Sequence, residues 1–278
     1  MFAGRIKGQH WLAVAMTMSF LAGCAGGRDD EPVHLVYVER PVESIYNQAL
    51  DALTAGRHQR AALLFDEVER QHPYSTWARR AMLFSAYGYY EANKYDEAIN
   101  ATDRFIKLHP GNEHVAYAYY LQAVCYYEQI TDVGRDQDTT RKASEALREV
   151  MRRFPSSEYA RDAKLKFDMT RDHLAGKEMA VGRFYQSDQK YVAAINRFNN
   201  VLADYQTTSH TPEALYRLTE TYLAMGVDGE AQASAAVLGY NYPGSKWYRR
   251  SYKLLAEKDL KPKAEEKSWL SRTIGRVL

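Results

Sequence analysis

Apolar and small residues recur along this chain at helical spacing, in blocks separated by short polar turns. The stretch "YYEANKYDEAINATDRFIKLHPGN", residues 89–112, shows the pattern: an aromatic residue ends one block, a short turn follows, and a second block opens with Tyr-Asp-Glu-Ala and closes at Pro110. Apolar positions three and four residues apart form one face of a helix. The stretch therefore predicts two helices that cross at the small residues Ala86 and Ala98, with Tyr89 filling the space beside them.

The same kind of landmark occurs in five copies. The copies close at Pro73, Pro110, Pro155, Gln206 and Pro243, so their spacings are 37, 45, 51 and 37 residues. Small, aromatic and apolar landmarks of the other copies are Ala49, Gly56, Ala61 and Phe65; Ala123, Tyr126, Ala143 and Leu147; Gly182, Tyr185, Ala194 and Phe198; and Leu215, Leu218, Tyr222, Gly226 and Ala231. Helix-turn-helix units of this kind, with a period of about 34 residues, are tetratricopeptide repeats (TPRs). The pattern predicts an all-α TPR solenoid of five repeats, and the common phase disfavours a generic helical bundle.

The two long spacings predict where the solenoid departs from regular repeats. In the third copy the excess is "TDVGRDQDTT", residues 131–140, which predicts a polar loop between two helices. In the fourth copy it lies in residues 158–185, where apolar positions keep helical spacing and no proline intervenes. We expect one long helix there. Repeats 1–3 would then occupy residues 42–160, and the linking helix, repeats 4–5 and a capping helix residues 161–260.

The amino terminus has the pattern of an exported lipoprotein. Two basic residues precede about a dozen apolar ones at 11–22, whereas a spanning helix needs about 20. "LAGC", ending at Cys24, matches a bacterial lipobox, which predicts a signal peptide over residues 1–23, a lipid on Cys24 as the one covalent group with no other cofactor, and a tether over 24–41. An ordinary signal peptide with a chance cysteine is the alternative. Ala25 in place of the aspartate that retains lipoproteins at the inner membrane favours the outer membrane.

Charge and catalytic motifs narrow the function class. Without the two basic residues of the signal, the chain holds 35 Lys and Arg against 35 Asp and Glu, so no net field favours nucleic acid. After Cys24 is lipidated, Cys125 is the only other cysteine and no internal disulfide can form. The sequence contains no nucleotide-binding loop, nucleophile elbow or zinc-protease motif. These observations predict a protein that is not an enzyme, with no catalytic residues and no metal site.

The first helix of each TPR pair is expected to line the concave face, where partners bind. The residues that we expect in an amino-terminal groove for an extended client peptide are Tyr46, Leu50, Tyr87, Tyr90, Tyr117, Tyr120 and Tyr127. A tyrosine offers an apolar face and a hydroxyl at its edge, which suits a peptide groove; burial in the solenoid core is the alternative for each ring. In the carboxy-terminal repeats the equivalent positions are more polar, and Arg183, Tyr216 and Glu220 are candidates for binding a partner.

The last segment, residues 261–278, departs from the repeats. After Pro262, Trp269 shares one predicted helical face with other apolar residues, and basic residues lie beside it. A basic amphipathic helix can lie on a membrane or dock on a partner. We favour a partner, and the alternative is a segment that takes up a fixed structure only when bound.

The combined features resemble the ComL/YfiO family of outer-membrane lipoproteins, which belong to the β-barrel assembly (BAM) machine. The resemblance covers essentially the whole chain and includes "YYEANKY" at 89–95, "NATDRFIKLHP" at 100–110 and "VAAINRFNNVLADY" at 192–205. It implies a scaffold on the periplasmic face of the outer membrane, held there by its lipid anchor. It also implies the partners: the POTRA domains of a BamA-like barrel subunit, bound through the carboxy-terminal repeats, other BAM lipoproteins, and unfolded outer-membrane proteins in the amino-terminal groove. Arg197 is a candidate for coupling the two halves. A TPR lipoprotein that scaffolds peptidoglycan enzymes or other periplasmic enzymes remains the alternative.

Overall fold

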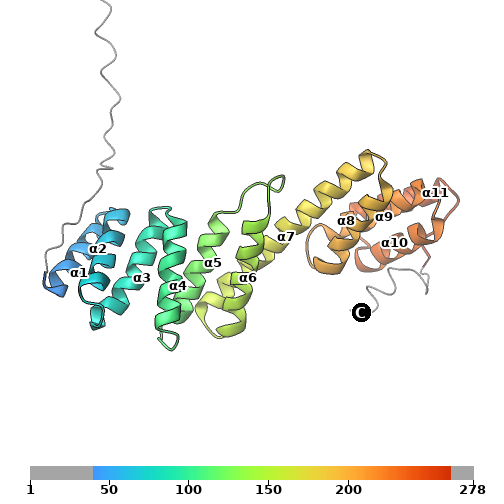
Figure 1. Ribbon diagram of the computed structural model, residues 1–278. Coiled ribbons are helices and arrows are strands. Elements are labelled where there is room, and N and C mark those ends of the chain that lie inside the picture. The colour runs from blue at the N-terminus through green and yellow to red at the C-terminus, as the bar shows by residue number, and fades with distance from the viewer. Residues whose placement is uncertain (1–39, 264–278) are drawn as a thin grey trace, which may run out of the picture. The chain divides into compact units, whose positions relative to one another are not determined.

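The computed structural model describes residues 40–263, and this part of the chain folds into eleven α-helices without a strand (Figure 1). The helices are α1 (Val42–Thr54), α2 (His58–Gln71), α3 (Thr76–Glu91), α4 (Tyr95–Leu108), α5 (Val115–Glu128), α6 (Asp138–Arg153), α7 (Glu158–Ser187), α8 (Tyr191–Asp204), α9 (Thr211–Ala224), α10 (Asp228–Asn241) and α11 (Lys246–Ala256).

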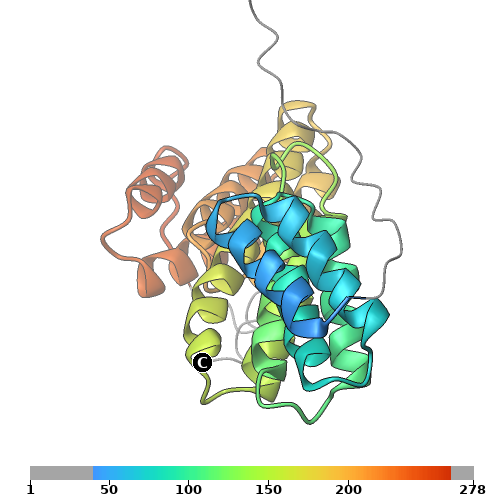
Figure 2. The ribbon, with the colours of Figure 1, turned by 90° about the vertical axis from the view of Figure 1, so that its left-hand side faces the viewer.

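The helices pack as successive pairs. Each helix from α1 to α11 contacts the next one along the chain, and the first helices of neighbouring pairs also touch: α1 contacts α3, α3 contacts α5, α5 contacts α7 and α7 contacts α9. Figures 1 and 2 show the helices following one another in chain order. This is the arrangement of a TPR solenoid, so the predicted all-α fold of five helix-turn-helix repeats is confirmed.

The predicted landmarks lie where the helices cross. The small landmarks Ala49, Ala61, Ala86 and Ala98 are fully buried. Phe65, Phe105 and Phe198, each on the second helix of its repeat, are fully buried as well. Small residues allow close backbone approach, and a phenylalanine fills the space that remains between paired helices.

Capping residues and glycines set several helix ends. Ser75 and Ser157 cap α3 and α7, because each side chain accepts a hydrogen bond from the backbone N–H three residues on. Gly56 and Gly226 end the turns after α1 and α9 with φ of 72° and 74°, a left-handed conformation that glycine adopts without steric cost.

The long linking helix is confirmed. Helix α7 has 30 residues; it contacts α5 and α6 of the third repeat as well as α8 and α9 of the last two repeats. Residue 160 lies in the first turn of α7, so the predicted boundary at 160/161 falls within one continuous helix. The polar loop predicted over 131–140 is also present, but it is shorter than predicted because α6 begins at Asp138. The Asp136 carboxylate accepts a hydrogen bond from the Asp138 N–H at the start of that helix.

Several predictions lie outside the described residues: the signal peptide over 1–23, the lipid on Cys24, nearly all of the tether over 24–41, and residues 264–278 with Trp269. The first described residue, Arg40, is fixed to the end of α2, since its N–H donates to Gln71 Oε1 at 3.0 Å and its carbonyl oxygen lies 2.8 Å from His72 Nε2. Of the helices described, none combines the length and apolar character needed to cross a membrane.

Candidate functional site

The first helices of repeats 1–3 enclose an aromatic groove. Its cavity has a volume of about 620 Å³ and is lined by Tyr46, Leu50, Arg80, Leu83, Phe84, Tyr87, His114, Tyr117 and Tyr159. Four of the seven residues predicted for the client groove are therefore brought together here, from α1, α3 and α5. The start of α7 adds Tyr159, so the long helix completes the wall of the groove.

The wall of the aromatic groove is held by ring contacts with the solenoid core. The ring of Tyr46 lies edge-on to Phe65 at 5.4 Å and to Trp77 at 4.8 Å, and only 5% of Tyr46 is exposed. Tyr117 packs against Tyr159 with centroids 5.7 Å apart. Edge-to-face ring pairs of this kind restrict side-chain motion. The groove wall is thus preorganised, and Tyr46 both belongs to the solenoid core and lines the cavity, while its contact with a client peptide stays a prediction.

Burial also fixes the ionisation of the groove tyrosines. It raises the pKa of Tyr46, and it raises the pKa of Tyr117 much further. Tyr87 has a raised pKa because of burial and because Glu91 lies nearby. Their hydroxyls stay protonated at neutral pH and can donate hydrogen bonds. The aromatic groove therefore combines an apolar surface with neutral donors, and Arg80 and His114 are the basic residues at its edge.

The three other residues predicted for the groove lie outside its cavity. Tyr90 packs on Tyr95 with ring centroids 6.0 Å apart. The Tyr120 hydroxyl donates to Asp162, and the Tyr127 hydroxyl donates to the sulfur of Met169 at 3.4 Å, both on α7. Tyr120 and Tyr127 connect α5 to α7.

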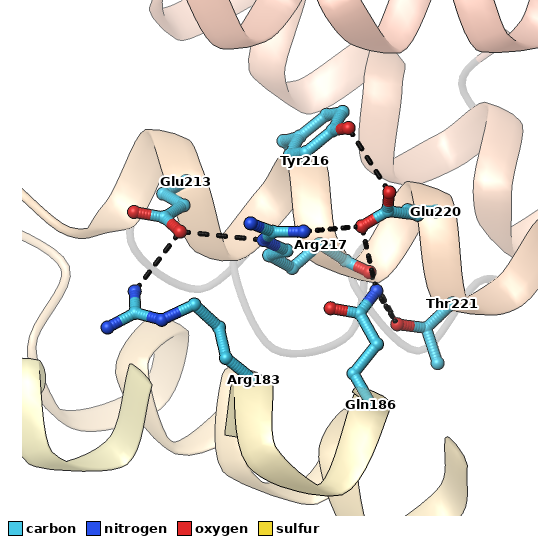
Figure 3. Close-up of polar contacts among 7 residues, drawn as sticks. All are labelled: Arg183, Gln186, Glu213, Tyr216, Arg217, Glu220 and Thr221. Atoms are coloured by element: carbon cyan, nitrogen blue, oxygen red, sulfur yellow. Dashed lines mark hydrogen bonds and ion pairs between the residues drawn. The ribbon is translucent and has the colours of Figure 1, made fainter. Parts of the chain in front are cut away.

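A polar network joins α7 to α9, as Figure 3 shows. Arg183 Nη1 lies 3.1 Å from Glu213 Oε1, and Glu213 also faces Arg217 at 3.5 Å. Arg217 pairs in turn with Glu220 at 2.8 Å. The Tyr216 hydroxyl donates to Glu220 at 3.2 Å. The network thus brings together the partner candidates Arg183, Tyr216 and Glu220.

Gln186 completes the polar network and closes it on α9. Its amide donates to Glu220 at 2.8 Å and to the Thr221 hydroxyl at 3.0 Å. Burial lowers the pKa of Arg217, but its hydrogen bond and charge interactions with Glu220 outweigh this and leave the pKa raised. Tyr216 also packs on Trp247 of α11 with ring centroids 5.2 Å apart. The polar network is therefore a row of alternating positive and negative side chains, which hydrogen bonds and the contact between Tyr216 and Trp247 hold in place.

Sequence reasoning missed Glu213 and Arg217, the two residues at the centre of the polar network. Both lie on the same helix as Tyr216 and Glu220, at the spacing of three and four residues that places charged side chains side by side. This spacing is the signal that could have identified them.

The predicted site residue Arg197 lines neither the aromatic groove nor the polar network. Arg197 on α8 faces Glu178 on α7 at 3.3 Å, and Asn200 donates to the same carboxylate at 2.9 Å. Both contacts join α8 to the linking helix α7, and the coupling role of Arg197 stays a prediction. Within residues 40–263, no group of three or more His, Cys, Asp or Glu side chains is arranged to hold a metal ion.

Comparison with known proteins identifies the family. The family model described as YfiO, outer membrane lipoprotein, matches residues 38–238. This chain belongs to the YfiO family. The resemblance noted in the sequence is thereby confirmed. The matched residues begin just before Arg40, the first described residue, and end within α10. They therefore include the aromatic groove and the polar network.

Curated relatives carry the name outer membrane protein assembly factor BamD. The relative from Caulobacter vibrioides is 52% identical over 254 residues, which cover 91% of this chain and 83% of that protein. The relative from Rickettsia prowazekii is 43% identical over 84% of this chain and 92% of that protein. Among solved structures, a thermophilic TPR protein of Thermus thermophilus is 19% identical, covers 78% of this chain and 100% of that chain, and gives a TM-score of 0.36. The fold assignment of this YfiO member rests on its own helices and not on that likeness.

Proposed function

We propose that this chain is an outer-membrane lipoprotein scaffold that takes part in the assembly of outer-membrane β-barrel proteins within a BAM complex. The observation that carries the proposal is the 52% identity, over 91% of the chain, to a relative named as an outer membrane protein assembly factor. The role is one of binding, without a catalytic step of its own.

The aromatic groove is the proposed site for unfolded outer-membrane proteins. An extended barrel strand presents alternating apolar and aromatic side chains, which match the rings of Tyr46, Tyr87 and Tyr117. The protonated tyrosine hydroxyls can donate to the backbone carbonyls of a strand that has not yet paired. A client therefore needs an extended segment rather than a particular sequence.

The carboxy-terminal repeats are the proposed docking surface for the POTRA region of a BamA-like barrel subunit, and other BAM lipoproteins are proposed to join the same complex. The polar network supports this assignment, because Arg183 has a side chain that is 40% exposed beside Glu213 on a fixed frame. Fixed, partly exposed charges favour specific association over nonspecific adhesion. Arg197, whose side chain is 41% exposed, adds a second positive charge on α8.

The lipid on Cys24 is the proposed anchor to the periplasmic face of the outer membrane. Several acyl chains hold a protein firmly, since each buried methylene contributes about 0.8 kcal/mol. Cys24→Ala should leave the helical content unchanged and move the protein from the membrane fraction to the soluble fraction. Membrane association that survives in a Cys24→Ala strain after high-salt washing would contradict the anchor.

Depletion of the protein tests the proposed function. We expect folded, heat-modifiable porins in the outer membrane to fall while lipoproteins that contain no barrel keep their levels. A tagged copy extracted in mild detergent should copurify with a barrel protein that carries POTRA domains. Unchanged porins after depletion, together with captured peptidoglycan enzymes, would contradict the proposal and favour a cell-wall scaffold.

A further inference from the structure

The exposed side of α11, the last described helix (Figure 1), carries only positive charge. Four exposed basic side chains share this side: Lys246, Arg249, Arg250 and Lys253. Residues three and four apart lie on one face of a helix, and the buried residues Ser251 and Leu255 lie on the opposite face. Helix α11 therefore packs on α9 and α10 with one face and presents four cations, the cationic face, on the other.

The charge of the cationic face is not compensated within this part of the chain. Residues 231–256, which form most of α10 and all of α11, contain these four basic residues and no acidic one. From the start of α10 to the last described residue, over 228–263, seven basic residues stand against four acidic ones, a net charge of +3. None of the four basic side chains forms an ion pair with another residue that the structure describes. An excess of positive charge thus remains on this surface.

The helices beside the cationic face do not neutralise it either. The last turns of α10, against which the ring of Tyr248 packs, carry no charge. On the side of α9, Trp247 packs on Tyr216, whose hydroxyl donates to Glu220. That carboxylate is already paired with Arg217 at 2.8 Å. The polar network is therefore balanced internally, and the cations of α11 add to it without a counterpart.

This arrangement opposes the stability of α11 itself. Like charges three and four residues apart repel each other. Lys246 is the first residue of the helix, where the helix dipole favours an acidic side chain, and the first turn contains none. Trp247 offsets part of this, because Lys246 Nζ and the Arg250 guanidinium lie 4.9 Å and 5.0 Å from its ring centroid. A capping helix that served solubility alone would be better with charges of both signs, so a face of one sign indicates a binding role.

We propose that the cationic face of α11 binds the acidic face of a helix in a partner protein. The four cations extend from Lys246 to Lys253, seven residues or about 10 Å along the helix axis. A partner helix packed lengthwise, with carboxylates at the same spacing of three and four residues, places one carboxylate near each cation. The two arginines match carboxylate oxygens with pairs of parallel N–H donors.

An anionic membrane is the other surface that such a face could meet, and the packing of α11 disfavours it. A helix that lies in a membrane surface inserts an apolar face between the lipids. The apolar face of α11 is already buried, since Leu255 is fully covered and packs with residues of α9 and α10. A protein partner needs only the charges that α11 exposes. The inference rests on these charges and does not depend on the proposed assembly function.

The test uses the full mature chain with Cys24→Ala and three fluorescein-labelled, alanine-rich peptides of about 20 residues, long enough to form a helix. The first carries glutamates along one face, the second carries the same number spread around the helix, and the third has glutamines in place of the glutamates of the first. At low salt we expect the one-face peptide to bind about fivefold more tightly than the second, and the glutamine peptide not to bind. Added salt should weaken binding.

Lys246→Glu separates binding from stability. It replaces an attraction by a repulsion, so the Kd of the one-face peptide should rise about tenfold. It also places an acidic side chain at the start of α11, so the thermal unfolding temperature should stay the same or rise. Loss of binding without loss of stability cannot come from unfolding. Lys253→Glu, a second variant at a side chain without any ion pair among the described residues, should weaken binding to a similar extent.

The matched control is Lys142→Glu, which makes the same change of charge at an exposed position on α6. It should leave the Kd unchanged. Equal weakening by Lys142→Glu and Lys246→Glu, or equal affinity for the one-face and spread peptides, would overturn the proposal, since binding would then follow net charge. Absence of peptide binding at low salt would overturn it as well. Binding to vesicles that contain phosphatidylglycerol, lost in Lys246→Glu and without peptide binding, would replace it by a lipid site.

Discussion

Gly182 on α7 lies directly against the ring of Phe198 on α8, so close that a β-carbon at Gly182 would stand 2.5 Å from Cε1 of that ring. Phe198 is fully buried and cannot turn away without opening a cavity. An alanine in a helix is worth about 1 kcal/mol more than a glycine, but this gain is smaller than the cost of overlap with a buried ring. We expect Gly182→Ala to lower the free energy of unfolding by about 1–3 kcal/mol, and Gly182→Leu to lower it further.

Urea unfolding followed by circular dichroism measures this effect, and the matched control is Gly176→Ala on the same helix. There a β-carbon would lie 3.3 Å from the Nε2 tip of the His210 ring, which can shift. The gain in helix propensity is the same for both variants, so their difference isolates the contact with Phe198. Equal stability of the two variants would show that α7 and α8 do not cross at Gly182.

The contact between Arg183 and Glu213 should couple α7 to α9. Glu213 is only 16% exposed, and the pair is separated by 3.1 Å. A double-mutant cycle with Arg183→Ala and Glu213→Ala should give a coupling free energy of about 0.5–1 kcal/mol, at the upper end for partly exposed pairs. Equilibrium unfolding of the two single variants and the double variant provides the measurement.

The pair Lys164–Asp168 on α7 serves as the control for this cycle, because both of its side chains are at least 50% exposed. Its coupling should be at most about 0.5 kcal/mol and should vanish in high salt, whereas the Arg183–Glu213 coupling should decrease less. A coupling for Arg183 and Glu213 no larger than that of the control pair would mean that the contact does not hold α7 and α9 together.

The repeats could be predicted because their landmarks are local. Ala86, Ala98 and Phe105 recur at fixed offsets from a closing proline, and each is needed where two helices that are adjacent in sequence cross. The long helix followed from the helical spacing of apolar residues over 158–185 and the absence of a proline there. Its continuity made the boundary between the third repeat and the linking helix harder to place, and the boundary predicted at 160/161 falls inside α7, since helical spacing alone does not mark a repeat boundary.

The aromatic groove could be predicted only in part, because its lining depends on contacts between repeats. Tyr46, Tyr87 and Tyr117 lie on three successive first helices, three residues before, one after and six before the landmark alanine of their repeats, and this spacing places them on one helical face that the sequence pattern predicts. Tyr159 belongs to the linking helix, outside any repeat, and was missed. Tyr120 occupies a suitable register position, but its hydroxyl is taken up by Asp162, a partner 42 residues away that no local pattern indicates.

The aromatic groove should bind client peptides through the Tyr87 ring. We expect Tyr87→Ala to weaken the binding of a fluorescein-labelled peptide with alternating apolar and aromatic residues about tenfold, the effect of losing a central aromatic contact. Tyr87→Phe, which keeps the ring, should weaken it less. Fluorescence anisotropy gives the Kd values.

Tyr74→Ala is the control for the groove, because Tyr74 is the same residue type in the same half of the chain and is fully exposed. It should leave the Kd unchanged. If Tyr74→Ala and Tyr87→Ala had equal effects, the peptide would be binding to exposed tyrosines in general and not to the groove.

The thiol of Cys125 should make the stability depend on alkaline pH. Cys125 is fully buried in α5, and burial raises the pKa of its thiol to about 12. In the unfolded chain a thiol ionises near pH 8.5, about the ordinary value for cysteine. Because the folded pKa lies above the unfolded one, the stabilisation from this group is complete below about pH 8.5 and is lost as the pH rises toward 12.

Two measurements on the Cys24→Ala chain, where Cys125 is the only thiol, check this. Ellman's reagent should react slowly with the folded protein at about pH 8 and rapidly in urea, since only the thiolate attacks. Between about pH 8.5 and 10.5 the free energy of unfolding should fall more steeply in this chain than in the same chain with Cys125→Ala, which lacks the titrating group while all tyrosines and lysines remain. Parallel pH profiles would mean that the thiol is not desolvated, and rapid labelling of the folded protein would place Cys125 outside the core of the third repeat.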